Sequence, residues 1–486
     1  MPVATDPGLL RELRAVLGPG LLVTAEACVA FECDALTAHA RTPDLVALPR
    51  TIEEVQAILS ICHAHRVPVV ARGAGTGLSG GALPVAGGLL LVLARLNEIL
   101  EIDPRRGLAR VQPGVTNLAV SEAAAPFGLY YAPDPSSQVA CSVGGNVAEN
   151  SGGVHCLKYG LTVHNVLAVR LVTMTGELLT IGAATGEAPG LNLLAAVIGS
   201  EGMLGVVVEV TVRLLPLPRR VELLLAAFAD VGQCADAVGQ VIAAGIVPAG
   251  LEMMDAPAIR AAEAFASCGY PLDAAALLLC EVDGLPEDVD DELARARAVL
   301  EAAGATSVRV ARDAEERRRM WSGRKSAFPA VGRLAPDYYC MDGTIPRRQL
   351  AAVLAEIDAL SQHHDLAVAN VFHAGDGNLH PLILFDAGKD GELERAEAFG
   401  AAILEACVAA GGTVTGEHGV GVEKLGPMCS QFATAELEAF HALKAAFDPD
   451  GLLNPGKAVP TLARCADYGA LKVHGGQLPH SHLPRF

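Results

Sequence analysis

Two short motifs in the second half of the chain combine histidines, a carboxylate and glycines in a pattern that can hold a metal ion. His373 and His380 stand seven residues apart with glycines between them, and Glu417 lies within the later segment Gly-Glu-His-Gly at residues 416–419. Two imidazoles and one carboxylate leave positions open on Zn²⁺ or a similar divalent ion, as a catalytic metal site requires. The alternative is three separate polar loop residues, because spacing alone does not bring residues 373 and 417 together.

A metal ion held in this way would suit the oxidation of a 2-hydroxy acid. It can bind the hydroxyl and carboxylate of the substrate and lower the pKa of the hydroxyl group. His418 could then take the hydroxyl proton as a general base, which is worth about 10²–10⁴-fold in rate. Glu417 and His418 are adjacent, so both face one site only in a tight turn, and the flanking Gly416 and Gly419 permit such a turn.

Arg324 is the candidate partner of a substrate carboxylate. It closes the segment Met-Trp-Ser-Gly-Arg at residues 320–324, and a guanidinium group can bind a carboxylate through two parallel hydrogen bonds. The competing prediction is a solvated basic helix face. That face would include Arg317, Arg318, Arg319, Arg324 and Lys325.

The first glycine-rich segment, residues 73–81, matches the Gly-x-Gly-x-x-Gly dinucleotide pattern from Gly75 to Gly80. That pattern needs a helix that opens at its last glycine, so that the helix N-terminus meets a pyrophosphate. A proline and two more glycines follow instead, and then a second predicted strand, so we expect a strand–loop–strand arrangement. Consecutive backbone N–H groups in such a loop can bind phosphate without a helix. A flexible surface loop is the alternative.

Two further segments extend this pattern. Residues 144–153 combine paired glycines with Asn146 and Asn150, and residues 199–205 read Gly-Ser-Glu-Gly-Met-Leu-Gly. Glycines allow a backbone to approach a large or flat ligand closely. Together the three segments predict an extended, mostly neutral ligand that carries a diphosphate.

The order of these segments resembles the FAD domain of the vanillyl-alcohol oxidase and p-cresol methylhydroxylase superfamily. The resemblance implies that residues 73–81 hold the FAD pyrophosphate and that residues 144–153 lie along the flavin and ribityl chain. Neither His nor Cys occurs in residues 73–81, so we expect FAD to be bound non-covalently. The residues expected to line the FAD site are Arg72, Gly73, Ala74, Gly75, Thr76, Gly77, Leu78, Ser79, Gly80, Pro133, Asp134, Ser137, Cys141, Gly144, Gly145, Asn146, Ala148, Asn150, Gly153, Tyr159, Glu201, Gly202, Val207 and Asn454.

The motifs of the second half resemble those of the FAD-dependent D-2-hydroxyacid dehydrogenases. The resemblance implies that His373, His380 and Glu417 bind the metal ion, that His418 is the base and that Arg324 holds the substrate carboxylate. We also expect Asn378, which stands between the two histidines, to contact the substrate. The segment Asn-Pro-Gly-Lys at residues 454–457 matches the closing motif that returns the C-terminus to the FAD domain.

Residues 337–346 are most similar to the FAD-carrying subunits of the glycolate-oxidising members of this family. The 2-hydroxyglutarate enzymes carry a lysine near the position of Cys340 and an asparagine at the position of Leu382, so a small substrate without a distal carboxylate fits better. The resemblance implies oxidation of glycolate to glyoxylate by hydride transfer to FAD. It also implies an iron–sulfur partner subunit, a second flavoprotein-like subunit and delivery of electrons to the quinone pool.

Two alternatives remain open. The first is a self-sufficient D-lactate dehydrogenase that uses FAD. The second belongs to another class, a non-catalytic FAD-binding subunit that serves assembly, and the joint presence of His373, His380, Glu417 and His418 argues against it.

Composition and charge exclude several partners. Lys and Arg number 36 against 55 Asp and Glu, for a net charge of −19, which argues against nucleic acid and anionic membrane surfaces. No apolar run reaches the length of a membrane span, and the first thirty residues do not read as an export signal. We therefore expect a cytoplasmic chain that reaches the inner membrane face only through partner subunits. No Cys-x-x-Cys spacing occurs, so iron–sulfur clusters are expected in another chain.

Strands and helices alternate without a steady βαβ rhythm, which predicts an α+β fold. We expect an N-terminal helical segment at 1–45, an FAD-binding domain at 46–218, a substrate or cap domain at 219–447 and a C-terminal segment at 448–486. A helix should begin after Thr51, with Glu53 and Glu54 in its first turn. Further predicted strands are 67–70, 89–93, 166–174, 205–215, 221–228 and 276–282, and further predicted helices are 292–303, 350–361 and 435–447.

Overall fold

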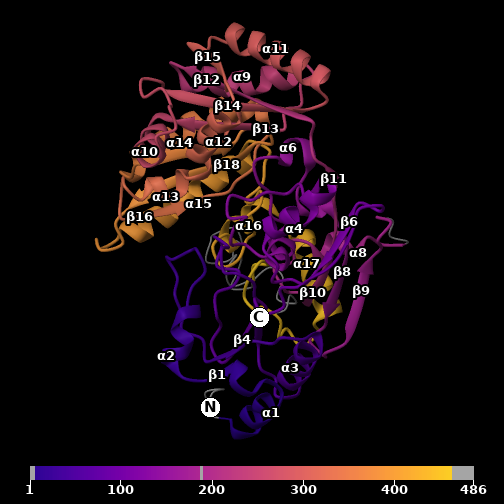
Figure 1. The fold of residues 1–486 in the computed structure, drawn as a ribbon. Helices are drawn as coiled ribbons and strands as arrows, with labels where there is room; N and C mark the ends of the chain where they lie inside the picture. Colours follow the sequence, from indigo (N-terminus) through magenta and orange to yellow (C-terminus); the bar gives the residue numbers. More distant parts are fainter. Residues whose placement is uncertain (1–5, 187–189, 462–486) are drawn as a thin grey trace. The chain divides into compact units, whose positions relative to one another are not determined.

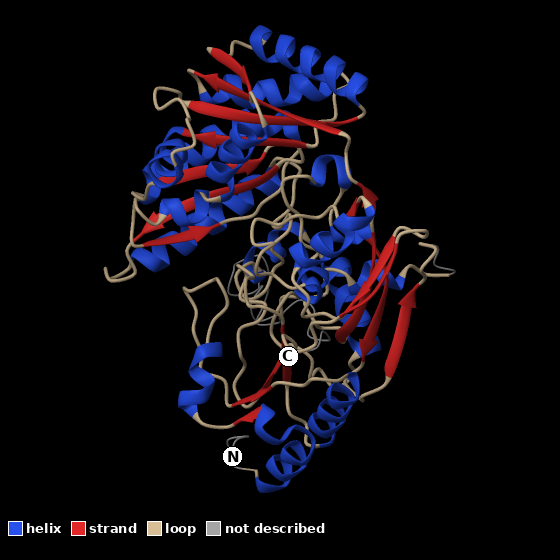
Figure 2. Ribbon diagram, in the orientation of Figure 1, coloured by secondary structure: helices blue, strands red, loops and turns tan. Residues whose placement is uncertain are grey.

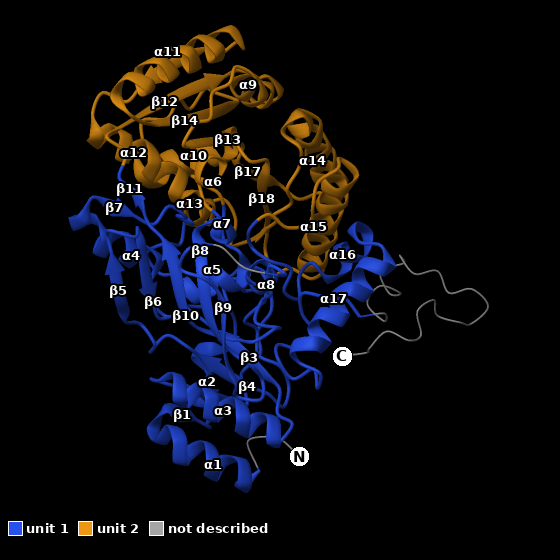
Figure 3. Ribbon diagram, turned by 90° about the vertical axis from the view of Figure 1, so that its right-hand side faces the viewer, with its two compact units in different colours: residues 1–152, 161–217, 417–486 blue, residues 153–160, 218–416 orange. Residues whose placement is uncertain are grey.

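The structure, a computed structural model, describes residues 6–186 and 190–461 of the chain. These residues form two compact units (Figure 3). Unit 1 is built from the described residues of 1–152, 161–217 and 417–486, and unit 2 from residues 153–160 and 218–416. The chain therefore leaves unit 1 and returns to it twice.

The two units divide the chain differently from the four expected segments. The break between Leu217 and Pro218 stands beside the expected boundary at 218–219, but residues 417–447 belong to unit 1 and residues 153–160 to unit 2. The N-terminal helix is not a separate body, because its buried leucines share one core with the helix that follows Thr51. Residues 462–486 of the expected C-terminal segment lie outside the described residues.

Unit 1 contains a four-stranded sheet in the order β1-β2-β4-β3, a five-stranded antiparallel sheet in the order β5-β6-β10-β8-β9, and a ribbon of β11 and β7 (Figures 1 and 2). Strand β4 lies parallel to β3, and residues 73–88 between them contain no helix, which confirms the predicted strand–loop–strand arrangement. The strands are β1 Leu21–Leu22, β2 Leu45–Ala47, β3 Val69–Arg72, β4 Leu89–Val92, β5 Ile99–Asp103, β6 Leu108–Val111, β7 Leu129–Tyr130, β8 Val166–Val172, β9 Leu178–Gly182, β10 Val206–Arg213 and β11 Leu215–Pro216.

The helices of unit 1 include the predicted capped helix. The hydroxyl of Thr51 accepts a hydrogen bond from the Glu54 N–H at 3.2 Å, as an N-cap residue does. The α-helices are α1 Pro7–Leu17, α2 Ala25–Cys28, α3 Ile52–Ala64, α4 Asn117–Ala124, α5 Val143–Glu149, α7 Thr162–Asn165, α8 Leu193–Val197, α16 Leu425–Gln431 and α17 Thr434–Phe447, and the short 3₁₀ turns are η2 Gly18–Gly20, η3 Val29–Phe31 and η4 Ala125–Phe127.

Unit 2 is built on one seven-stranded antiparallel sheet in the order β15-β12-β14-β13-β17-β18-β16. Its strands are β12 Arg220–Phe228, β13 Gly250–Asp255, β14 Ala276–Gly284, β15 Ser307–Val310, β16 Asp337–Cys340, β17 Val368–His373 and β18 Asn378–Phe385. Its helices are α6 Cys156–Tyr159, α9 Val231–Ala243, α10 Ala256–Ala266, α11 Pro286–Ala302, α12 Ala314–Lys325, α13 Ala327–Val331, η5 Arg347–Gln349, α14 Leu350–His364 and α15 Glu392–Ala409.

Three neighbouring strands of this sheet, β13, β17 and β18, are buried at every position. Helices α9 and α10 contact β13, and α15 contacts β18. A polar side chain inside such a strand must find a partner within the protein or a ligand. The acidic and histidine residues of these strands are therefore the first place to look for a site.

Helix α6 explains why residues 153–160 belong to unit 2. The Lys158 ammonium and the Tyr159 hydroxyl both bind the Asp283 carboxylate on β14, at 2.5 and 2.7 Å. His155 approaches the Glu281 carboxylate of the same strand at 3.0 Å. Charged contacts over a sequence distance of more than a hundred residues leave no periodic signal, so the sequence did not predict this crossing.

The mixture of sheets and helices in both units confirms the α+β prediction. Within residues 6–186 and 190–461, no helix combines the length and the apolar character that crossing a membrane requires.

Candidate active site

The hairpin of β17 and β18 brings His373 and His380 together. His373 pairs with Asn378 and Val371 pairs with His380, so the two histidine side chains project from the same face of the hairpin as diagonal neighbours. Their ring centroids lie 5.0 Å apart with the planes at 84°. The expected convergence of these two residues is thus a direct result of strand register.

Close packing fixes the turn of this hairpin. Gly377 has a φ of +83°, and an added Cβ would overlap the backbone carbonyl oxygen of Ile345. A side chain at this position would be strained both by its backbone conformation and by lack of space. Gly377 is therefore required for the turn that brings the two histidines together.

Glu252 on β13 is the central partner of the site in unit 2. Its Oε1 lies 2.9 Å from His373 Nδ1 and its Oε2 lies 2.6 Å from Arg324 Nη2. Glu252 and Arg324 are each 1 % exposed. A carboxylate bound to one ring nitrogen of a histidine orients the ring so that its other nitrogen can bind a metal ion.

Arg324 lies on the buried side of α12, so the prediction of a solvated basic face is wrong for this residue. Other arginines of the same helix, Arg318 and Arg319, are exposed. The Nε of Arg324 has no hydrogen-bond partner among the residues that the structure describes. A buried N–H without a protein acceptor is costly, so it is suited to a ligand carboxylate.

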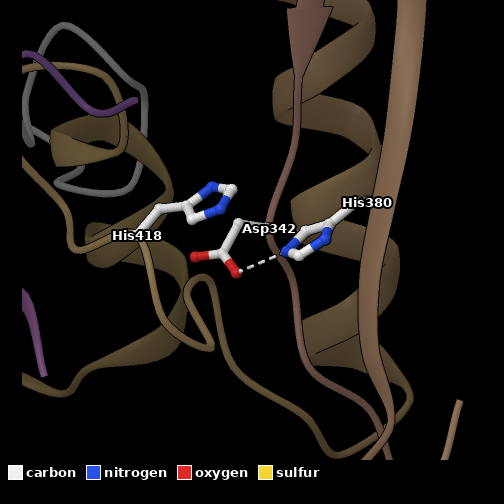
Figure 4. Close-up of side chains that lie close together, drawn as sticks. All are labelled: Asp342, His380 and His418. Carbon is white, nitrogen blue, oxygen red and sulfur yellow. Dashed lines mark ion pairs between the residues drawn. The ribbon is translucent and has the colours of Figure 1, made fainter. Parts of the chain in front are cut away.

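A second carboxylate, Asp342, follows β16. It therefore lies at the β18 edge of the hairpin, whereas Glu252 lies at the β17 edge, on β13. Asp342 is fully buried and forms an ion pair with His380, with 3.4 Å between Oδ1 and Nε2 (Figure 4). The Asn378 amide donates to Oδ1 at 2.8 Å and the Thr415 hydroxyl donates to Oδ2 at 2.6 Å. The predicted contact between Asn378 and the substrate would therefore use the remaining amide oxygen.

Asp342 also anchors the point at which the chain leaves unit 2. The Gly416 N–H donates to the Asp342 carbonyl at 2.8 Å and lies 3.1 Å from its carboxylate. An added Cβ at Gly416 would overlap the Asn378 amide nitrogen, so a larger residue does not fit. Glu417 follows directly, one peptide bond beyond this anchor.

Glu417 and His418 lie in unit 1, in a tight segment that contains two left-handed glycines. Gly419 has a φ of +81° and Gly421 a φ of +52°. The carboxylate of Glu417 lies 3.9 Å from Nε2 of His418, so the two adjacent side chains point to one side. This is the tight turn that the flanking glycines predicted.

The first glycine-rich segment fits the diphosphate of FAD. Gly75 and Gly80 have φ values of +74° and +75°. Within the described part of the chain, the backbone N–H groups of residues 75–79 donate to no protein acceptor. Consecutive N–H groups left open in this way form an anion-binding backbone. An added Cβ at Gly73 would overlap the Ser142 hydroxyl, so the start of the segment lies tightly against the second one.

The first part of the second segment forms a short helix, α5. The Ser142 hydroxyl accepts the Gly145 N–H at 3.3 Å and so begins the helix. The Asn146 amide nitrogen is enclosed and has no partner in the part of the chain that the structure describes, so it is available to a ligand. Burial raises the pKa of the Cys141 thiol, which disfavours the thiolate that covalent attachment would need.

The closing motif returns to the glycine segments within unit 1. The Asn454 amide donates to the carbonyl oxygens of Gly81 and Glu201 at 3.1 and 2.6 Å.

The predicted site residues fall into two sets, one in each unit. Those of unit 1 are residues 72–80, Pro133, Asp134, Ser137, Cys141, Gly144, Gly145, Asn146, Ala148, Asn150, Glu201, Gly202, Val207, Glu417, His418 and Asn454, and those of unit 2 are Gly153, Tyr159, Arg324, His373, Asn378 and His380.

Sequence reasoning missed the roles of Glu252 and Asp342. Glu252 had a signal that could have found it, since it interrupts the apolar strand Gly250–Asp255, where an isolated carboxylate needs a partner. Asp342 follows the short strand β16, and its partners come from two distant segments, β18 and residues 415–416, so no local pattern marks it.

The chain matches two protein-family models. A model of FAD binding domains matches residues 43–182, and a model of the C-terminal domain of FAD linked oxidases matches residues 217–458. Both matches agree with the motifs described above.

The chain is also similar to proteins whose activity is named. It is 60 % identical over 487 residues to the glycolate oxidase subunit GlcD of Escherichia coli strain K12, covering 100 % of this chain and 98 % of that protein. It is 40 % identical over 435 residues to the subunit GlcD of Bacillus subtilis strain 168, covering 89 % and 93 %. A solved structure of p-cresol methylhydroxylase matches with a TM-score of 0.77 at 17 % identity, covering 95 % of this chain and 99 % of that one, which confirms the predicted fold.

The buried pair of Glu252 and Arg324 leads to a stability prediction. Glu252→Gln should lower the free energy of unfolding by about 3–5 kcal/mol, because it leaves a buried guanidinium without its counter-charge. Asp290→Asn is the matched control, since it breaks the solvent-exposed pair of Asp290 and Arg220. It should change the free energy of unfolding far less, because solvent screens an exposed pair. Urea denaturation of both variants measures the difference, and equal small losses would contradict the assigned pairing.

Proposed function

The chain belongs to the FAD-linked oxidases, and from that premise we propose that it oxidises glycolate to glyoxylate by transferring a hydride to FAD. The observation that supports this most is the buried Arg324, whose Nε has no partner among the described residues and whose Nη2 lies 3.5 Å from His373 Nδ1. A carboxylate bound there would lie beside the two converging histidines. This is the arrangement that oxidation next to a carboxylate requires.

The residues of the chain have separate roles in this proposal. Arg324 binds the substrate carboxylate, and Glu252 holds both Arg324 and His373 in place. His373 and His380 are two ligands of a divalent ion such as Zn²⁺, with Glu417 proposed as the third. When bound, the ion polarises the substrate hydroxyl and FAD accepts the hydride. His418 takes the hydroxyl proton as the C–H bond breaks, so the substrate loses a hydride and a proton in total.

The positions of Cys340 and Leu382 support a small substrate. They pair directly across β16 and β18, and both side chains are buried in the apolar core of unit 2. Neither position offers a cation or an amide to a second carboxylate. We therefore propose glycolate over a 2-hydroxy diacid.

The electrons must then leave the reduced flavin. We propose that an iron–sulfur partner subunit receives them, with a second flavoprotein-like subunit in the same complex and the quinone pool as the final acceptor. The lack of any Cys-x-x-Cys spacing in the sequence and the similarity to a named oxidase subunit support this route.

The choice of substrate is tested by anaerobic bleaching of the flavin absorbance. Purified protein loaded with FAD should be reduced by glycolate with a larger second-order rate constant than by D-lactate, because the buried Cys340 and Leu382 favour a small substrate. D-2-Hydroxyglutarate serves as the control and should be slowest. A clearly larger rate constant with D-lactate would assign the chain to the D-lactate dehydrogenases instead.

The proposed base is tested by substitution. His418→Ala should lower the rate of flavin reduction by about 10²–10⁴-fold while the FAD content stays the same, because proton removal loses its acceptor. His63→Ala is a matched control on α3, where the ring pairs with Asp450 at the surface. Stopped-flow reduction and the flavin spectrum measure both effects. A rate within about twofold of wild type in His418→Ala would remove this residue as the base.

A further inference from the structure

Five charged side chains of unit 1 form a cluster between the glycine segments and the segment that carries Glu417 and His418. Four of them are 5 % exposed or less, and Glu149 is partly exposed with its Oε2 enclosed. The members of this cluster are Asp34, Glu149, Glu201, Lys424 and Lys457. Apart from Glu201, which was expected to line the FAD site, none of them has a role in the proposed function, so their burial needs another explanation.

Glu201 holds the backbone immediately after His418. Its Oε1 accepts the Val420 N–H and its Oε2 accepts the Gly421 N–H, both at 2.7 Å. Both carboxylate oxygens are thus bound to one turn of the chain, two and three residues beyond His418. Charge-assisted hydrogen bonds of this kind are about twice as strong as neutral ones.

The backbone of Glu201 is itself strained, which points to a specific function. Its φ of +50° lies in the left-handed region that residues other than glycine rarely adopt. Such strain persists where the surrounding structure requires it. Here it is the conformation from which the carboxylate reaches the two N–H groups.

The same turn also contacts the first and second glycine segments. The Val422 and Glu423 N–H groups donate to the Ser79 carbonyl at 3.0 and 3.2 Å. An added Cβ at Gly419 would overlap Glu149 Oε2 and would lie 3.0 Å from Glu201 Oε1. The segment after His418 is therefore held on both sides, and Glu201 binds it through both carboxylate oxygens.

Charge explains how two carboxyl groups lie side by side here. Burial raises the pKa of Glu149 well above its ordinary range, and the neighbouring Glu201 raises it further. Burial also raises the pKa of Glu201, and the two N–H bonds, which favour its ionised form, oppose that rise. The neighbouring charge thus acts against ionisation of Glu149, whereas two N–H bonds favour the ionised form of Glu201.

We propose that Glu201 is a positioning residue that fixes the turn after His418 and thereby sets the places of Glu417 and His418. The proposal rests on the proposed function in so far as Glu417 and His418 are the ligand and the base. Glu201 was expected to contact FAD, whereas both of its carboxylate oxygens are bound to this turn. The carboxylate of Asp34 and the ammonium groups of Lys424 and Lys457 complete its surroundings.

Hydrogen exchange of the FAD-loaded protein without substrate tests the positioning directly. Glu201→Gln keeps the size of the side chain but can accept only one N–H and turns an NH₂ group toward the other. Exchange at Val420 and Gly421 should become about 10-fold faster or more, with other peptides of unit 1 unchanged. Glu149→Gln is the matched control, because Glu149 lies beside the same turn while the Val420 and Gly421 N–H groups donate to Glu201. It should change exchange by less than about twofold.

A shorter carboxylate keeps the test decisive if Glu201→Gln does not fold. Glu201→Asp retains the charge but cannot reach both N–H groups, so exchange at the same two positions should again rise. Unchanged exchange in Glu201→Asp would overturn the proposal, and so would a uniform rise over all peptides of unit 1, which indicates a merely structural role.

Kinetics separate this proposal from the proposed function. In Glu201→Gln, kcat for glycolate should fall about 10-fold or more while KM stays within about threefold, since Arg324 is untouched. If wild-type protein does not oxidise glycolate, the proposed function fails while hydrogen exchange still decides the role of Glu201. A wild-type kcat in Glu201→Gln overturns the positioning role.

Discussion

The geometry of the candidate site in unit 2 depends on the two contacts of the Glu252 carboxylate. This carboxylate lies in a strand that is buried at every position, and it binds the guanidinium of Arg324 on one side and the imidazole of His373 on the other. Without it, a buried cation would lack its counter-charge and a histidine would lack its orientation. The chain as a whole carries a charge of −19, so a local cation is needed to attract an anionic substrate. In the proposed function Arg324 supplies that cation, and Glu252 makes its burial tolerable.

Glycines serve the same geometry in a different way. At Gly377, Gly416 and Gly419, an added Cβ would overlap a neighbouring group, so the absence of a side chain is what permits the approach. These residues lie beside the proposed metal ligands and the proposed base. The high glycine content of the chain, 51 of 486 residues, therefore reflects close approaches at the second set of motifs as well as the loops of the FAD domain.

Much of the site could be predicted from the sequence, because its parts are local. The seven-residue spacing of His373 and His380 corresponds to a hairpin register, and the glycines around Glu417 and His418 correspond to a tight turn. The burial of Arg324 could not be decided in this way, since its helix has arginines on both the exposed and the buried side. Glu252 and Asp342 act through partners far away in the sequence, and residues 153–160 join unit 2 through ion pairs with β14. Contacts of this kind form only in the folded sheet, so no periodic pattern in the sequence predicts them.

The central claim is that Arg324 binds the carboxylate of the substrate. The most direct test measures anaerobic flavin reduction against glycolate concentration for wild type and Arg324→Lys, which keeps the charge next to Glu252 but loses the forked donor. The account predicts that the dissociation constant for glycolate rises about tenfold or more while FAD remains bound. An unchanged dissociation constant in Arg324→Lys would contradict it.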